Sequence, residues 1–342
     1  RRFVIPEYQR GYSWEKPQWS DLTKDLTYLL ESQKNYRHYT GTIVATEQNS
    51  VSNDLPTFEV VDGQQRLTSL TLLIACLLQK LDRPNIGSTN SKLNPDSIKD
   101  LFLIKGEDSG NTIRKFKIGP EQDDLYYSLI REGYYSDTKS DTKSDQNLVR
   151  VYDYFSVWLD TMPLGDVLDV IVNRFGFLFY APEKSKEIGI MFEVINNRGK
   201  QLSELEKLKN YLIYFSEKNE VPDLKKTILS TWGDILTRLN QCELTSNDEE
   251  DSFLRNCWIA SQDTNKNKSY HVYEQLKDNY PPDNRDNWSE LKSFVEFIDF
   301  ASTVYLKFHE SETVTNNTEK KWLKRIHFHP STASVMPLIL AI

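Results

Sequence analysis

The sequence is poor in cysteine and in long apolar runs. Its three cysteines, odd in number and far apart in 342 residues, exclude a disulfide framework and a paired-cysteine metal site. No apolar run approaches the length of about 20 residues that a membrane-crossing helix needs, and no secretory leader opens the chain. We therefore expect a soluble cytoplasmic protein without a membrane span.

Basic residues are outnumbered as well. The chain has 50 acidic against 42 basic residues and a formal net charge of −8. This balance disfavours a protein that coats nucleic acid through bulk electrostatics, although it allows a locally basic groove.

Several catalytic motifs are also missing. Neither GxxxxGK[ST] nor GxGxxG occurs, which disfavours a P-loop enzyme and a Rossmann dehydrogenase. Five scattered histidines form no pattern typical of a nucleophilic triad. His327 and His329 resemble a nuclease pair only weakly, because no carboxylate follows nearby, and we assign them no role.

The front half of the chain mixes helical and strand patterns. Leucines at helical spacing predict a helix over residues 15–32, and the apolar stripe from Leu67 to Leu81 predicts a buried helix that begins near Gln64. Strand patterns rich in β-branched or aromatic residues occur at 39–47, 58–61, 101–104, 113–118 and 174–182. We expect the first two strands to share a sheet, the next two to form a hairpin and the last to be buried.

The remaining segments divide the chain. Residues 82–97 carry loop-forming residues, and the tandem polar repeat at 136–145 is expected to be a mobile surface insertion. Nearly everything after Lys184 has helical spacing. The sequence thus predicts an α+β domain at residues 1–183 and an α-helical domain at 184–342. Because the chain stops in the apolar segment MPLILAI, we expect further sequence after it.

The stretch FEVVDGQQRLTSL passes from a strand pattern into a helix. As plain structure, Asp62 would be the N-cap, Gln65 would complete a capping box and Gly63 would allow a tight turn. Gln64 and Arg66 are left unexplained, because a cation at the start of a helix opposes its dipole. A strand, a sharp turn and a helix N-terminus with a guanidinium are typical of phosphate binding. The spacing supports a cap and a binding site equally.

A second polar cluster is IPEYQRGYSW. Pro6 punctuates a loop in which Tyr8, Gln9 and Arg10 offer a flat ring, an amide and a guanidinium for a base, sugar or phosphate. Aromatic residues mostly serve burial, so core packing is the simpler interpretation of Trp14. For Gln9 and Arg10, contact with a ligand is the better interpretation.

A third cluster lies in FEVINNRGKQLSELEKLKNYL. Asn196, Arg198 and Gly199 form a polar turn, and Ser203 begins a new helix with a glutamate three residues on, as in a capping box. A helix end would explain the turn. Lys209 on the next helix adds a further group suited to phosphate oxygens.

These three blocks, in this order and with YTGTIV before the second, resemble the N-terminal domain family of GmrSD-type and SspE-like restriction proteins. The resemblance covers most of residues 3–215. It implies a ParB-like (sulfiredoxin-like) α+β module followed by a helical domain, acting in prokaryotic defence against DNA with modified bases or backbones. It also implies an HNH-type nuclease as a C-terminal domain or a separate partner, which this sequence does not show.

The resemblance assigns roles to individual residues. It makes DGQQR a nucleotide-binding and NTPase motif, in which Asp62 would position Mg²⁺ or water and Arg66 would neutralise phosphoryl charge, while Gln64 or Gln65 orients water or phosphate. Further nucleotide contacts are expected from Gly63, Tyr8, Gln9, Arg10, Asn196, Arg198, Gly199 and Lys209. DNA contacts are expected from Pro6, Tyr8, Gln9, Arg10 and Trp14.

Three functions fit these residues. The first is an NTP-hydrolysing sensor of a modification-dependent (type IV) restriction system, with a nucleotide, modified DNA and a nuclease as partners. The second is a non-hydrolysing, nucleotide-gated DNA clamp that works with a separate nuclease. The third is an interaction scaffold in which DGQQR is only a cap. The choice of ATP, GTP or UTP, the DNA modification and the assembly into a homo-oligomer stay open.

Overall fold

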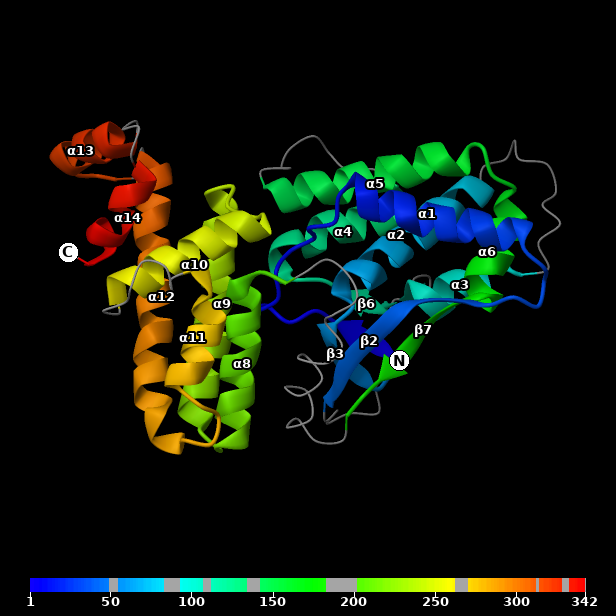
Figure 1. Ribbon diagram of the computed structural model, residues 1–342. Coiled ribbons are helices and arrows are strands. Elements are labelled where there is room, and N and C mark those ends of the chain that lie inside the picture. Colours follow the sequence, from blue (N-terminus) through cyan, green and yellow to red (C-terminus); the bar gives the residue numbers. More distant parts are fainter. Residues whose placement is uncertain are drawn as a thin grey trace. The chain divides into compact units, whose positions relative to one another are not determined.

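The protein is an α+β chain with two compact units (Figure 1). A computed structural model describes residues 1–48, 55–82, 93–106, 112–133, 142–182, 202–261, 270–311, 314–327 and 332–341. The first unit, Arg1–Glu183, combines a small mixed sheet with helices, and the second, Lys184–Ile342, is helical. The α+β class is confirmed, whereas kinship with ParB stays a prediction.

The first unit is built on a five-stranded sheet. In chain order it contains β1 Arg2–Val4, α1 Lys16–Glu31, β2 His38–Gln48, β3 Thr57–Asp62, α2 Gln64–Leu81, α3 Pro95–Phe102, β4 Ile104–Lys105, β5 Ile113–Arg114, β6 Phe116–Lys117, α4 Pro120–Glu132, α5 Lys143–Leu159, α6 Leu164–Asn173 and β7 Phe175–Tyr180. The strand order is β6-β1-β3-β2-β7, and β4 pairs with β5 in a separate two-stranded sheet. Strand β1 runs parallel to β3 and β6, while β2 runs antiparallel to β3 and parallel to β7.

The predicted helices at 15–32 and from Gln64 are confirmed as α1 and α2, and the predicted strands at 39–47 and 58–61 as the neighbours β2 and β3. Strand β1 was not predicted, since no strand pattern was recognised at residues 2–4. It has three residues, and parallel neighbours on both sides define it. Pairing of this kind is non-local and leaves no period in so short a stretch.

The predicted hairpin is only partly correct. Helix α3 takes up Leu101 and Phe102, and β6 joins the main sheet, so only β4 and β5 form the antiparallel pair. The helix starts inside the expected loop because Asn94 accepts hydrogen bonds from the N–H groups of Asp96 (2.8 Å) and Ser97 (3.4 Å). An Asn-Pro pair thus serves as a helix start rather than as a loop.

Two further expectations need correction. Residues 136–141 of the polar repeat lie outside the described residues, but its end forms the start of α5, where Thr142 and Asp145 make a capping box and Asp145 is buried. Strand β7 is an edge strand rather than a buried one. Its Phe175 is buried, whereas Leu178 is 60% exposed.

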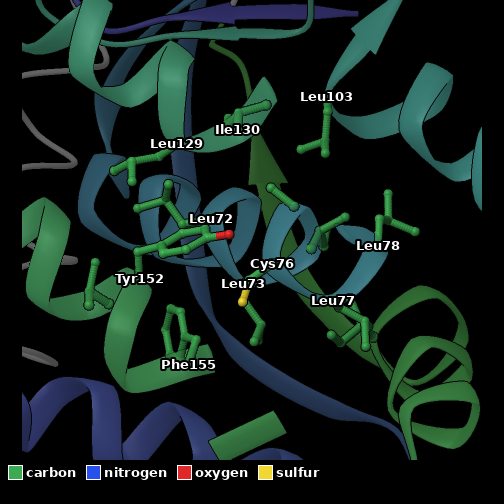
Figure 2. Packing of buried hydrophobic residues seen from close by; sticks show 14 of the residues in the cluster. Leu72, Leu73, Cys76, Leu77, Leu78, Leu103, Leu129, Ile130, Tyr152 and Phe155 are labelled. Atoms are coloured by element: carbon green, nitrogen blue, oxygen red, sulfur yellow. The ribbon is translucent and has the colours of Figure 1, made fainter. Parts of the chain in front are cut away.

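Helix α2 is the centre of the core in the first unit. Figure 2 shows Leu72, Leu73 and Leu77 of α2 together with Leu129 of α4 and Phe155 of α5, all fully buried. Burial of each such side chain contributes about 1.5–3 kcal/mol. Because α2 follows β3 directly, the same packing fixes the position of the turn between them.

The second unit is a set of packed helices. It contains α8 Glu204–Lys218, α9 Pro222–Gln241, α10 Asn247–Ser261, α11 Val272–Asn279, the short 3₁₀ helix η3 Arg285–Asn287, α12 Trp288–His309, α13 Asn317–His327 and α14 Thr332–Ala341. The predicted capping box at the start of α8 is confirmed, with Ser203 Oγ 3.2 Å from the N–H of Glu206. Trp232 and Trp258 are buried at its centre.

The three cysteines form no disulfide bond with one another. Cys76, Cys242 and Cys257 are free and buried. Burial raises the pKa of the Cys242 thiol to about 12, which makes it a poor nucleophile. Throughout the described part of the chain, no helix has both the length and the apolar character needed to cross a bilayer.

Candidate functional site

The turn between β3 and α2 carries the DGQQR segment. Asp62 is the last residue of β3 and pairs with Val44 of β2, and Gly63 takes the N-cap position before Gln64. Asp62 as N-cap is therefore a wrong expectation, because ladder pairing holds it in the strand. No side chain caps α2 at this residue. The first N–H groups of the helix, which have no intrahelical partners in any helix, therefore receive no hydrogen bond from the N-cap side chain.

Gly63 has a left-handed backbone, with φ of 94° and ψ of 7°. A Cβ atom there would lie 3.0 Å from Ile43 Cγ1 and 3.1 Å from the carbonyl oxygen of Thr42. Both the backbone angle and the close approach of β2 require glycine.

We expect Gly63→Ala to destabilise the first unit. A left-handed alanine costs about 1–2 kcal/mol, and the contact with Thr42 adds to that cost because a backbone atom cannot move aside freely. Denaturant unfolding measures the loss. Gly119→Ala is the matched control, since a Cβ atom at Gly119 meets nothing within 4 Å. An equal loss of unfolding free energy in the two variants would contradict the requirement for glycine at Gly63.

Gln65 fastens the loop that precedes α1. Its Oε1 accepts from the N–H of Ser13 at 2.8 Å, and its Nε2 donates to the carbonyl of Gly11 at 3.0 Å. Both ends of the amide are thus occupied by backbone. Gln65 therefore positions a loop, with one N–H and one oxygen lone pair of its amide left over.

Gln64 differs from its neighbour. It is 8% exposed, and its Nε2 donates to the carbonyl of Arg10 at 3.4 Å. Its Oε1 is buried and, within the described residues, has no hydrogen-bond partner. Because the Arg10 carbonyl can only accept, the amide orientation is fixed and the unsatisfied atom is an acceptor. A hydrogen bond from a water, a hydroxyl or an N–H group would satisfy this acceptor.

Arg66 lies beside β2. Its Nη1 donates to the carbonyl of Thr42 at 3.1 Å and lies 4.0 Å from Asp62 Oδ2. Its guanidinium rests on Gly41, where a Cβ atom would come within 3.0 Å of Cζ. In the described part of the chain the bond to Thr42 is its one hydrogen bond, so most donors of the fork are available to an anion.

The PEYQR segment joins this turn through β3. Gln9 Nε2 donates to the carbonyl of Val61 at 3.1 Å, and Tyr8 Oη donates to Glu59 Oε1 at 2.5 Å. The backbone N–H of Gln9 donates to Pro6, closing a turn. The structure therefore brings two of the three predicted blocks together, more than 50 residues apart in sequence.

The aromatic residues after Arg10 belong to the core. Tyr12 is 3% exposed, and its hydroxyl lies 2.6 Å from Ser69 Oγ and 2.9 Å from Trp19 Nε1. Burial raises the pKa of this phenol, although both hydrogen bonds oppose the change. Trp14 is partly buried and packs against the same core.

The third predicted block lies beyond the first unit. Asn196, Arg198 and Gly199 lie outside the described residues. Lys209 lies on α8 in the second unit and is 2% exposed, and its neighbour Lys207 pairs with Glu204 Oε1 at 2.9 Å. The nucleotide roles expected for these residues stay predictions.

Asp62 is the carboxylate of this turn and is the expected Mg²⁺ ligand. Within the described ranges, no three His, Cys, Asp or Glu side chains gather in a way that could hold a metal ion. A single carboxylate nevertheless suits Mg²⁺, which often takes one or two protein carboxylates and draws further ligands from phosphates and water. The donor set therefore fits a metal that arrives with a nucleotide.

Sequence reasoning missed Gly41, Thr42 and Ser13, which hold Arg66 and Gln65 in place. Gly41 has a positive φ of 129°, and the glycine in YTGTIV was a visible sign of it. No local pattern marks the other two, because they act through backbone atoms.

Comparison with known proteins assigns a family. The model of the family described as GmrSD restriction endonuclease, N-terminal domain, matches residues 1–213, more than half of the chain and all of the DGQQR turn. Among curated proteins none matches the chain.

Proposed function

This chain belongs to the family of GmrSD restriction endonuclease N-terminal domains, and from that premise we propose that its DGQQR turn binds and hydrolyses a nucleoside triphosphate. Membership makes the chain a module of a restriction system that defends against phage. Nucleotide turnover would make it the sensor of a modification-dependent (type IV) system. An HNH-type nuclease would then cut the DNA.

The unsatisfied oxygen of Gln64 carries the proposal. A buried amide oxygen without a donor is costly, by about 1–3 kcal/mol, unless a ligand or water completes it. It lies on the first residue of α2, where free N–H groups and the helix dipole favour an anion. An acceptor and an anion-binding helix end, side by side, suit a water held next to a phosphate.

Each residue then has a separate role. The Arg66 fork would neutralise charge that develops on the transferred phosphoryl, and the Gln64 oxygen would accept a hydrogen from the attacking water. Gln65 would act at a distance by holding the Gly11–Ser13 loop. Asp62 would hold Mg²⁺, which when bound screens the phosphate charge.

A second candidate is a nucleotide-gated DNA clamp that binds without hydrolysis. It is favoured by the two hydrogen bonds between Gln65 and the loop at Gly11 and Ser13, since they would transmit a change at the turn to the adjoining PEYQR segment. Binding would then shift the protein between two states rather than drive chemistry.

The test is to incubate the purified chain with Mg²⁺ and ATP, GTP or UTP, and to measure phosphate release and thermal stability together. We expect phosphate release and a higher melting temperature, since nucleotide at 100 times its Kd stabilises by about 2.7 kcal/mol. A stability gain without phosphate release would favour the clamp. No stability gain and no release with any of the three nucleotides would refute both.

A further inference from the structure

The five-stranded sheet has a second face that the core does not use. Phe3, Phe116 and Phe175 point into or against the core of the first unit. Because side chains alternate along a strand, their neighbours point to the opposite face. Residues on this outward face are Arg2, Tyr39, Thr57, Glu59, Lys117 and Leu178. Helices α1, α2 and α5 lie to one side of these strands in Figure 1.

One end of this face is basic. Lys117 pairs with Val4 of β1, while the carbonyl of Lys115 accepts from the N–H of Phe3 at 2.8 Å, which brings both lysines next to Arg2. Burial lowers the pKa of Lys115, and the nearby charge of Lys105 lowers it further, while the charge of Asp100 opposes both. Lys115 is 9% exposed, so we call only Arg2, Lys105 and Lys117 the basic edge.

No carboxylate pairs directly with the basic edge. Among the residues that the structure describes, none of its three cations forms an ion pair, and Arg2 Nε is buried without a hydrogen-bond partner. By contrast, the neighbouring Arg114 pairs with Asp123 at 2.7 Å. In a chain with a net charge of −8, a group of three such cations points to an anionic partner.

The other end of the face is aromatic and apolar. Tyr39 of β2 is 68% exposed and lies across Gly176 of β7, where a Cβ atom would be 3.9 Å from its ring. Leu178, two residues further along β7, is 60% exposed on the same side. Exposed flat and apolar side chains on the same face as cations are typical of surfaces that stack nucleobases.

The one acidic residue among those named on this face is held by its neighbours. Glu59 accepts from Tyr8 Oη through one oxygen and from Gln48 Nε2 at 2.9 Å through the other. Its hydrogen-bonding capacity is largely used within the protein. Arg2 and Lys117 lie on the same face, so the cations outnumber the acidic residue among the residues named.

We propose that this outward face binds a single strand of nucleic acid, with bases on Tyr39 and Leu178 and phosphates on the basic edge. The strands that carry Tyr39 and Lys117 are three steps apart in the sheet, or about 14 Å, and Tyr39 also lies seven residues along β2 from Thr46, which is level with Lys117. The two ends of the face are therefore roughly 25 Å apart, a distance that several nucleotides can span. A single strand fits better than a duplex, because only unstacked bases can lie on exposed rings. The inference rests on the proposed function only in taking DNA as the polymer that the system handles.

The chain supplies matched controls on α1. Tyr28 is 57% exposed, and its ring lies 5.8 Å from that of Tyr36, so it is an equally accessible tyrosine away from the outward face. Lys16 and Lys24 are exposed lysines on the same helix, and Lys24 pairs with Asp21. Changes at these residues alter charge and ring content equally.

The experiment is fluorescence anisotropy with a labelled oligothymidine of about 16 nucleotides and with a duplex of equal length. We expect Tyr39→Ala to weaken binding to the single strand roughly tenfold to hundredfold, and Tyr39→Phe to restore it. Lys105→Gln with Lys117→Gln should lower the slope of log affinity against log salt by about 0.7 for each phosphate that is no longer neutralised. Tyr28→Ala, and Lys16→Gln with Lys24→Gln, should leave binding unchanged.

Several results would overturn the inference: no binding by the unaltered chain, equal losses in the α1 controls, a single strand that binds as tightly to Tyr39→Ala as to the unaltered chain, or a duplex that binds as tightly as the single strand. The two proposals fail separately. Phosphate release without face-dependent DNA binding removes this inference and keeps the nucleotide site. DNA binding that depends on this face, together with no phosphate release and no stabilisation by nucleotide, removes the nucleotide site and keeps this inference.

Discussion

The Arg66→Ala variant is expected to release phosphate from nucleoside triphosphate about 10²–10³-fold more slowly than the unaltered chain. The guanidinium uses one N–H for the carbonyl of Thr42, which leaves the rest of its fork available to an anion, and we propose the transferred phosphoryl as that anion. Loss of that one hydrogen bond costs about 1 kcal/mol, so the fold survives. Asp62→Ala should abolish release as well, because it removes the expected Mg²⁺ ligand.

The measurement is the rate of phosphate release at saturating nucleotide, with an unfolding curve for each variant. Arg66→Lys should recover only part of the rate, since an ammonium keeps the charge and loses the planar fork. Arg150→Ala is the control, because Arg150 is an exposed arginine on α5 that contacts Gln146 at 3.3 Å. Turnover like that of the unaltered chain in folded Arg66→Ala would remove Arg66 from the reaction.

The adjacent glutamines are expected to separate chemistry from stability. Gln64→Ala should slow phosphate release on the order of 10²-fold, because the attacking water loses its acceptor, and it should change stability little. Gln65→Ala should lower the free energy of unfolding by about 2 kcal/mol, because it leaves the N–H of Ser13 and the carbonyl of Gly11 without their partner.

The two glutamines serve as controls for each other, since they share residue type and helix turn. Phosphate release and urea unfolding are measured on both variants at a temperature at which both are folded. If Gln65→Ala slows the reaction as strongly as Gln64→Ala without loss of stability, then Gln65 contacts the reacting groups and its role in holding the loop is wrong. Equal destabilisation would show that both residues are structural.

Local patterns predicted much of the fold. The stripe of α2, the strands β2 and β3 and the capping box before α8 were all visible in the sequence, because each depends on residues within a few positions of one another. Strand β1 and the start of α3 were not. Strand β1 depends on pairing with strands far along the chain. At the start of α3, an Asn-Pro pair is compatible both with a loop and with a helix start.

The sequence alone determined which residues form the candidate site and which family they match: DGQQR at a strand-to-helix turn, with PEYQR before it. Only the tertiary structure decided what each residue contacts there. Gln65 is occupied by a loop 54 positions away, whereas the oxygen of Gln64 is buried and unsatisfied. The physical reason is that hydrogen bonds of buried amides are fixed by backbone groups that folding brings close, and these groups have no residue signature.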